Sequence, residues 1–195
     1  MRIFRQFELD PRLFVSSAIT LLILPLPWCI ALIFSAGFHE ICHLIALRIC
    51  GCQSPQIRIG PSGAVIYSAP LSIGKALLCT LAGPLGQLFL IILARRFPRL
   101  VLCATVQAIY NLLPLNDLDG GHALQYILET FLPVTTAKSV CLHINWITLL
   151  LLCILAIYAT FILQLGLIPI IFAGALLIKT TSGKIPCKSQ SLRVQ

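Results

Sequence analysis

His39-Glu40-Ile41-Cys42-His43 is a polar motif inside one of the most apolar segments of the chain. Each helical residue turns the backbone by about 100°, so two histidines four residues apart lie roughly 40° from one another around the axis. Both imidazoles can therefore reach one point in space, which is the spacing that a zinc ion requires from a helix. Glu40 projects to the side of this pair, close enough to meet a water on the metal. Ionisable groups in an apolar run are costly unless paired, metal-bound or facing a wet cavity, so the motif indicates a functional site.

The composition indicates that this site is surrounded by lipid. Of 195 residues, 58% are hydrophobic and only 10% are charged, and the mean hydropathy is +0.98. A water-soluble domain of this size could not bury so much apolar surface. The sequence therefore predicts an integral membrane protein with one polytopic domain over residues 1–195. The net charge of +8 is interpreted as basic loops on the cytoplasmic face, and no nucleic-acid partner is expected.

The nine cysteines do not predict a disulfide framework. They are odd in number, they form no C-x-x-C pair, and most lie in apolar runs. We interpret most of them as small packing residues. Cys50 and Cys52, one residue apart, are a weak candidate pair for a metal.

Hydropathy and helix breakers predict an all-α membrane protein with about six transmembrane helices. The first apolar run has the length of a signal-peptide core, but Pro25-Leu26-Pro27-Trp28 follows it in place of a small-residue cleavage site. We therefore interpret it as a short first span that ends at the prolines. The third span contains Ala82–Gln87, whose small residues and proline allow close helix contact. The expected spans are 13–25, 28–49, 73–94, 100–113, 144–165 and 167–178.

Two non-helical elements interrupt the predicted bundle. Ile57-Arg58-Ile59 and Val65-Ile66-Tyr67 are typical of short strands around the turn Gly60-Pro61-Ser62-Gly63. This small β-hairpin is expected to be membrane-associated, at the interface or in a protein-lined cavity, because open strand edges cannot face lipid. The second element is a broken-helix loop over 111–122, where proline, asparagine and two glycines are expected to stop a helix and line a cavity. A short amphipathic or interfacial helix is expected from Ala123 to Phe131.

The distribution of basic residues predicts the orientation. Six spans place both termini on one face, and eleven of the fourteen lysines and arginines fall on that face. Only Arg95, Arg96 and Arg99 fall on the other. By the positive-inside rule, both termini, the two non-helical elements and the opening of the metal site are expected to be cytoplasmic.

The third zinc ligand has few candidates. Two histidines leave a catalytic zinc ion short of a protein ligand. Among the six acidic residues, Asp117 and Asp119 alone lie in a broken-helix element that could fold against the second span. From the residues alone both aspartates remain open.

At this point the sequence resembles a known family. The His-Glu-x-x-His motif in a membrane helix, followed by Asn111-Leu112-Leu113-Pro114 and Leu118-Asp119-Gly120-Gly121, is similar to the site-2 protease family of intramembrane zinc metalloproteases. The resemblance covers most of the chain. The short form, without PDZ or CBS domains, is most similar to the sporulation branch, that of the stage IV sporulation protein FB.

The resemblance implies a role for each site residue. His39, His43 and Asp119 are implied to hold Zn²⁺, and Glu40 is implied to be the catalytic acid and base. Asn111 and Gln87 are implied to hydrogen-bond the substrate backbone. Gly63 belongs to the hairpin that is expected to hold an extended substrate as an added strand.

Three positions depart from the usual pattern of the family. Cys42 stands where a small residue is usual, Asp117 where proline is frequent, and Gln87 where asparagine is usual. Asp117 is therefore a rival ligand, whereas Cys42 is interpreted as filling a close helix contact rather than binding zinc.

The implied activity is hydrolysis of a peptide bond in or near a transmembrane segment. By resemblance, the substrate is a membrane-tethered regulatory protein such as a pro-sigma or anti-sigma factor, cleaved by regulated intramembrane proteolysis in a bacterial cell membrane. An inhibitory membrane partner is a further expectation.

Two other functions remain open. A divalent-metal transporter also lines its pathway with buried histidines and acids, and a proteolytically inactive relative could bind transmembrane segments as a regulator. A transporter would need polar residues along several spans. The last two expected spans offer little of this kind beyond Asn145, Thr148, Thr160 and Gln164.

Overall fold

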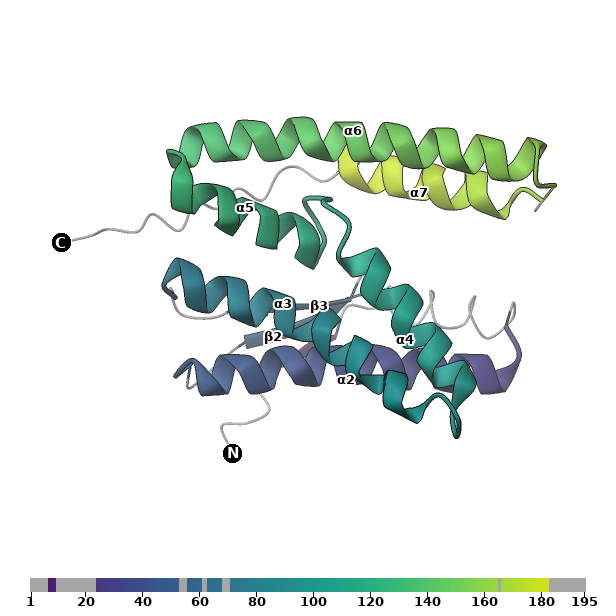
Figure 1. The fold of residues 1–195 in the computed structure, drawn as a ribbon, viewed down its shortest axis with the longest axis horizontal. Coiled ribbons are helices and arrows are strands. Elements are labelled where there is room, and N and C mark those ends of the chain that lie inside the picture. Colours follow the sequence, from purple (N-terminus) through teal and green to yellow (C-terminus); the bar gives the residue numbers. More distant parts are fainter. Residues whose placement is uncertain are drawn as a thin grey trace. The chain divides into compact units, whose positions relative to one another are not determined.

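The computed structural model describes residues 7–9, 24–52, 56–60, 63–67, 71–164 and 166–182 (Figure 1). Six α-helices, one 3-10 helix and three short strands lie in this described part. Its contacts group into two compact units, Met1–Asn111 and Leu112–Gln195, which we describe one at a time. The organisation as a single domain stays a prediction. The expected first span lies almost wholly outside the described residues.

The first unit is built on three helices that each pack against the other two (Figure 1). They are α2, Leu26–Ile49; α3, Ile73–Phe89, continued by the 3-10 helix η2, Leu90–Leu93; and α4, Pro98–Asn111. These bounds lie within about two residues of the predicted spans. Prolines fix two of the starts, because a proline in the first helical turn lacks only an N–H that would have no helical partner there.

The predicted hairpin is present in the first unit. Strand β2, Gln56–Gly60, pairs antiparallel with β3, Gly63–Tyr67, and Gly60 lies opposite Gly63. A strand that was not predicted, β1, Phe7–Leu9, pairs parallel with β2, so β2 is the central strand of the three. Strand β3 is therefore at an edge of the sheet. Association of this sheet with the membrane stays a prediction.

The second unit consists of α5, Asp119–Phe131; α6, Val134–Phe161; and α7, Ile168–Ser182. Helix α6 packs against both α5 and α7 (Figure 1). It begins at Val134, well before the predicted residue 144, because Pro133 is its N-cap and no helix breaker follows until the far end. Hydropathy predicted the apolar part of this helix, whereas its start is set by the proline.

Helix α5 also begins earlier than predicted. Gly120 and Gly121 were expected to stop a helix, but they lie in its first turn. A Cβ on Gly120 would overlap the carbonyl groups of Leu112 and Leu113, and a Cβ on Gly121 would overlap the carbonyl oxygen of Leu115. The glycines are therefore required because the loop backbone passes against the helix start, not because the helix ends there.

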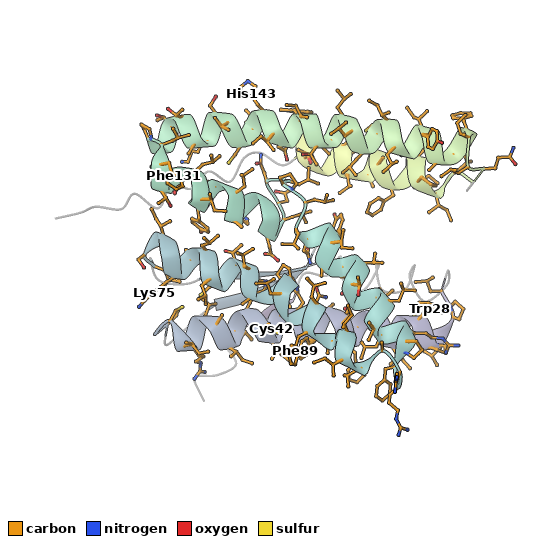
Figure 2. The ribbon with its side chains drawn as sticks, viewed as in Figure 1. Trp28, Cys42, Lys75, Phe89, Phe131 and His143 are labelled. Atoms are coloured by element: carbon orange, nitrogen blue, oxygen red, sulfur yellow. The ribbon has the colours of Figure 1, made fainter. Side chains whose placement is uncertain are left out.

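Burial in both units is inverted relative to that of a water-soluble protein. The polar side chains of Ser35, Gln87 and Asn145 are at most 1% exposed. Phe89 is 70% and Phe131 78% exposed, and both project away from the ribbon (Figure 2). Small and polar residues inside, with large apolar residues outside, are typical of helices surrounded by lipid.

Three helices are long and apolar enough to cross a membrane: Leu26–Ile49, Ile73–Leu93 and Val134–Phe161. A shorter apolar stretch covers Ile168–Ile178 in α7. The chain is a multi-pass membrane protein. The number of six spans and the orientation stay predictions.

Basic side chains anchor both ends of the first unit. Lys75 Nζ donates to the carbonyl oxygen of Cys50, the C-cap of α2, at 3.1 Å. Trp28 marks the opposite end (Figure 2). There the guanidinium carbon of Arg99 lies 6.0 Å from the centre of the Trp28 ring. Such basic and aromatic residues are enriched where a helix leaves the apolar core of a bilayer.

Candidate metal centre

His39 and His43 lie in the middle of the buried face of α2. Burial along this helix recurs at every fourth residue, so one stripe faces the neighbouring helices. The two imidazoles are 6% and 9% exposed. The stripe consists of Ala31, Ser35, His39, His43 and Leu47.

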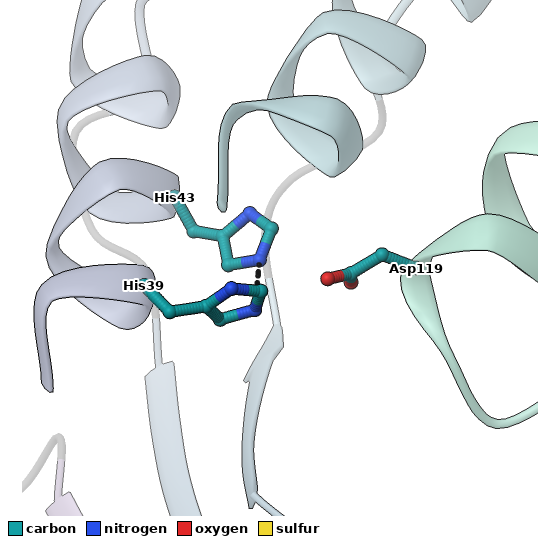
Figure 3. A group of neighbouring side chains, drawn as sticks. All are labelled: His39, His43 and Asp119. Carbon is teal, nitrogen blue, oxygen red and sulfur yellow. Dashed lines mark hydrogen bonds between the residues drawn. The ribbon is translucent and has the colours of Figure 1, made fainter. Parts of the chain in front are cut away.

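The two imidazole rings meet edge to face. Their centroids are 4.6 Å apart with an interplanar angle of 85°, and the two Nε2 atoms are 3.0 Å apart (Figure 3). Groups on helix α3 contact Nδ1, the other nitrogen of each ring. His43 Nδ1 lies 2.7 Å from the carbonyl oxygen of Cys79, and His39 Nδ1 lies 3.0 Å from Gln87 Oε1. The predicted convergence of the two histidines is confirmed.

These partners determine which nitrogen of each ring carries the proton. A carbonyl oxygen can only accept a hydrogen bond, so Nδ1 must be the donor in both rings. A neutral imidazole has only one N–H, so a ring protonated on Nδ1 can offer Nε2 to a metal ion. The two Nε2 atoms lie 3.0 Å apart and face the same point. The pair therefore fits a metal ion bound through both Nε2 atoms, with each Nδ1–H held by an oxygen behind it.

Helix α3 closes one side of the pair through a glycine. A Cβ on Gly83 would overlap His43 Nε2 and lie 2.7 Å from His39 Cε1. One turn further, a Cβ on Gly86 would overlap Cys42 Sγ. The close helix contact predicted for this segment is confirmed, and Cys42 fills it.

Asp119 is the first residue of α5, and its side chain is partly buried. The loop before it is anchored by Leu115 and Leu118, which are 3% and 6% exposed, whereas Asp117 is exposed. The loop is also held by Asn145 of α6, whose Oδ1 accepts the N–H of Asn116 at 3.0 Å. The buried leucines and this hydrogen bond therefore hold the backbone that leads to Asp119 in place.

The first unit offers two imidazole nitrogens, from His39 and His43, and the second unit offers a carboxylate oxygen, from Asp119; these are ligand types that could hold a metal ion. Asp119 belongs to the second unit of the chain, and its approach to the imidazoles is part of the function proposed below.

The other predicted site residues occupy distinct environments. Glu40 follows His39 on α2 and is partly buried. Gln87 is 1% exposed, and its amide is hydrogen-bonded to the His39 ring and to the backbone of Ser35. Asn111 is the last residue of α4, and Gly63 is the first residue of β3. Contact of Gln87, Asn111 or Gly63 with a substrate stays a prediction.

Several residues that support the histidines in the first unit, or Asp119 in the second, were not predicted. Ser35 and Gln107 belong to the hydrogen-bond network behind His39, and Asn145 holds the loop before Asp119. Ser35 carries one sequence signal, because it lies four residues before His39 on an apolar helix. The carbonyl group of Cys79 carries none, because it belongs to the backbone.

Neither a protein-family model nor a curated protein matches the sequence. Among solved structures, the site-2 protease from Methanocaldococcus jannaschii matches with a TM-score of 0.66. The match covers 97% of this chain and 93% of that chain at 18% sequence identity. This chain has the fold of a site-2 protease. The sporulation branch and catalysis itself stay predictions.

Proposed function

We propose that this protein is an intramembrane zinc metalloprotease of the site-2 protease type. The observation that carries the proposal is the convergence of the two Nε2 atoms, 3.0 Å apart, in the middle of a helix that can span a membrane. A site-2 protease fold over nearly the whole chain supports it. The expected substrate is a membrane-tethered regulatory protein, such as a pro-sigma or anti-sigma factor, cut in or near its transmembrane segment.

Asp119 is the proposed third ligand. Two imidazoles and one carboxylate are a ligand set of catalytic zinc that leaves a fourth position for water or substrate. A zinc ion held there would lower the pKa of a water toward about 7 and polarise a carbonyl group. Asp117 is the weaker candidate because its side chain is exposed.

Glu40 is the proposed general base and acid. It is adjacent to His39, so the helix places its carboxylate beside the pair rather than on the opposite face. In this role Glu40 accepts a proton from the attacking water and returns it to the leaving amine. A carboxylate in a membrane span is costly, which is consistent with a residue kept for its chemistry.

The substrate must be unwound before it can be cut, because the carbonyl groups of a helix are engaged in its own hydrogen bonds. Strand β3 begins at Gly63 and lies at the edge of its sheet. We propose that an extended segment of the substrate adds to this edge through main-chain hydrogen bonds.

Replacing single residues of β3, at Ala64, Val65 and Ile66 in turn, by proline tests this binding mode. At least one replacement removes an N–H that the added strand needs, so cleavage should be lost while bound zinc is retained. Val65→Ala, which keeps every N–H, is the matched control. Full turnover in all three proline variants would reject strand addition.

Glu40→Gln tests the enzymatic role. The amide cannot accept the proton, so cleavage of a membrane-tethered reporter should fall by roughly 10²–10⁴-fold while zinc content is unchanged. Glu129→Gln, on α5, is the matched acid-to-amide control. If Glu40→Gln cleaves at the wild-type rate, Glu40 is not the base. A transporter or a non-catalytic regulator would show no Glu40-dependent product.

A further inference from the structure

Behind His39, three helices meet in a chain of buried hydrogen bonds. Gln87 Nε2, on α3, lies 3.2 Å from the carbonyl oxygen of Ser35, 3.0 Å from Ser35 Oγ and 2.8 Å from Gln107 Oε1, so its two N–H groups are shared among three acceptors. Ser35 of α2 also donates its hydroxyl to Gln107 Oε1, on α4, at 2.6 Å. We call Ser35, Gln87 and Gln107 the polar clamp.

The polar clamp admits only one orientation of the Gln87 amide. The backbone oxygen of Ser35 can only accept, so the group of Gln87 that faces it must be the NH₂. Gln107 then has to present its oxygen to that NH₂, because two donors would oppose one another. The remaining atom of the Gln87 amide, Oε1, faces His39 Nδ1 at 3.0 Å.

The orientation of the Gln87 amide affects the proposed zinc site. Since Oε1 of Gln87 only accepts, it keeps the proton of His39 on Nδ1 and the lone pair on Nε2, toward His43. If the amide turned over, its NH₂ would face Nδ1 and favour the opposite tautomer, which cannot bind a metal through Nε2.

We propose that the polar clamp is a positioning device for the metal site, in which Gln107 fixes the amide of Gln87 and Gln87 fixes the tautomer of His39. The inference rests on the metal site proposed above. Hydrogen-bond partners of metal-binding histidines typically contribute about 10–100-fold to metal affinity. Gln107 has no contact with the rings in this scheme and acts only through Gln87.

Two variants and their combination test the polar clamp in the full-length protein. Gln87→Met removes the acceptor of His39 at similar length, and Gln107→Leu removes the oxygen that orients Gln87. Zinc affinity, measured by competition with a chelator, should fall about 10–100-fold for Gln87→Met and less for Gln107→Leu. The double variant should have the same zinc affinity as Gln87→Met, because Gln107 acts only through the Gln87 amide, which both of these variants lack. Thr148→Val, which loses only a hydroxyl bond within α6, is the control.

A second measurement reports the tautomer without any metal. In zinc-free protein at alkaline pH, ¹⁵N NMR of labelled histidine should place the His39 proton on Nδ1 in the wild type. Gln87→Met and Gln107→Leu should show a mixture of both tautomers. The clamp is rejected if the wild type carries the proton on Nε2, if neither variant changes the tautomer, or if the two losses of affinity simply add. Failure of the wild type to bind zinc would instead overturn the proposed function.

Discussion

At the residue scale, the sequence predicts the histidine pair but not what orients it. Spacing along one helix is a local property, so the convergence of His39 and His43 follows from the helical repeat alone. Their hydrogen-bond partners lie on α3, at Cys79 and Gln87. Contacts between residues so far apart in sequence depend on how the helices pack, and no local pattern encodes them. The oxygen atoms that face the two Nδ1 atoms, and so favour a proton there, become visible only in three dimensions.

Gly83→Ala should damage the metal centre directly. The added methyl group overlaps His43 Nε2, so the rings or α3 must move, at a cost of about 1–3 kcal/mol in unfolding free energy. Zinc content of the purified protein should fall as well. The matched controls are Gly74→Ala on α3 and Gly37→Ala on α2, where a Cβ has nothing within 4 Å. Wild-type zinc content in Gly83→Ala would contradict the described contact.

At the element scale, hydropathy predicted which helices exist, and backbone chemistry decided where they begin. The spans that became α2 and α3 were placed to within a few residues. The start of α6 was missed because Pro133, not the apolar run, sets it. The start of α5 was missed because Gly120 and Gly121 are typical of a helix stop, whereas here they allow a loop to pass close to the first turn. Such a close approach depends on tertiary packing, so it cannot be recognised from the sequence alone.

Gly121→Ala should displace Asp119 from its position at the start of α5. The added Cβ overlaps the carbonyl oxygen of Leu115, which is backbone and cannot swing aside. We expect zinc content and cleavage to fall together. Gly174→Ala on α7, with nothing within 4 Å of the added Cβ, should change neither. Normal zinc content in Gly121→Ala would show that Asp119 needs no such fixed loop.

Asn145→Leu should loosen the loop that leads to Asp119. The variant leaves the N–H of Asn116 without its acceptor, at a cost of about 1–3 kcal/mol for a buried group and less where water can reach it. Thermal unfolding in detergent measures the loss, with Thr148→Val on the same helix as the control. An unchanged midpoint would mean that this bond does not hold the loop.

At the scale of the whole molecule, composition predicted a membrane protein, and the distribution of side chains supports it. Ser35, Gln87 and Asn145 are buried while large apolar side chains face outward, which is a stable arrangement only in lipid. The sequence also predicted the site-2 protease fold, through two short motifs far apart in the chain. The unpredicted strand β1 shows the limit of this reasoning, because its pairing with β2 is not local.

The orientation in the membrane is a prediction at this scale. A protease recognition sequence inserted between Arg95 and Arg96 should be cut by protease added outside intact cells, because this turn carries the few basic residues of the outer face. The same sequence inserted after Asn116 should be cut only by protease expressed in the cytoplasm. The reverse result would place the metal site on the wrong side for a cytoplasmic substrate.

The most direct test of the account is zinc X-ray absorption on the purified full-length protein. We predict one zinc per chain, with two imidazole nitrogens at about 2.0–2.1 Å and the remaining ligands oxygen. Loss of one oxygen ligand in Asp119→Ala would identify the carboxylate. Absence of stoichiometric zinc, or a shell of sulfur at about 2.3 Å from cysteine, would contradict the His39, His43 and Asp119 site.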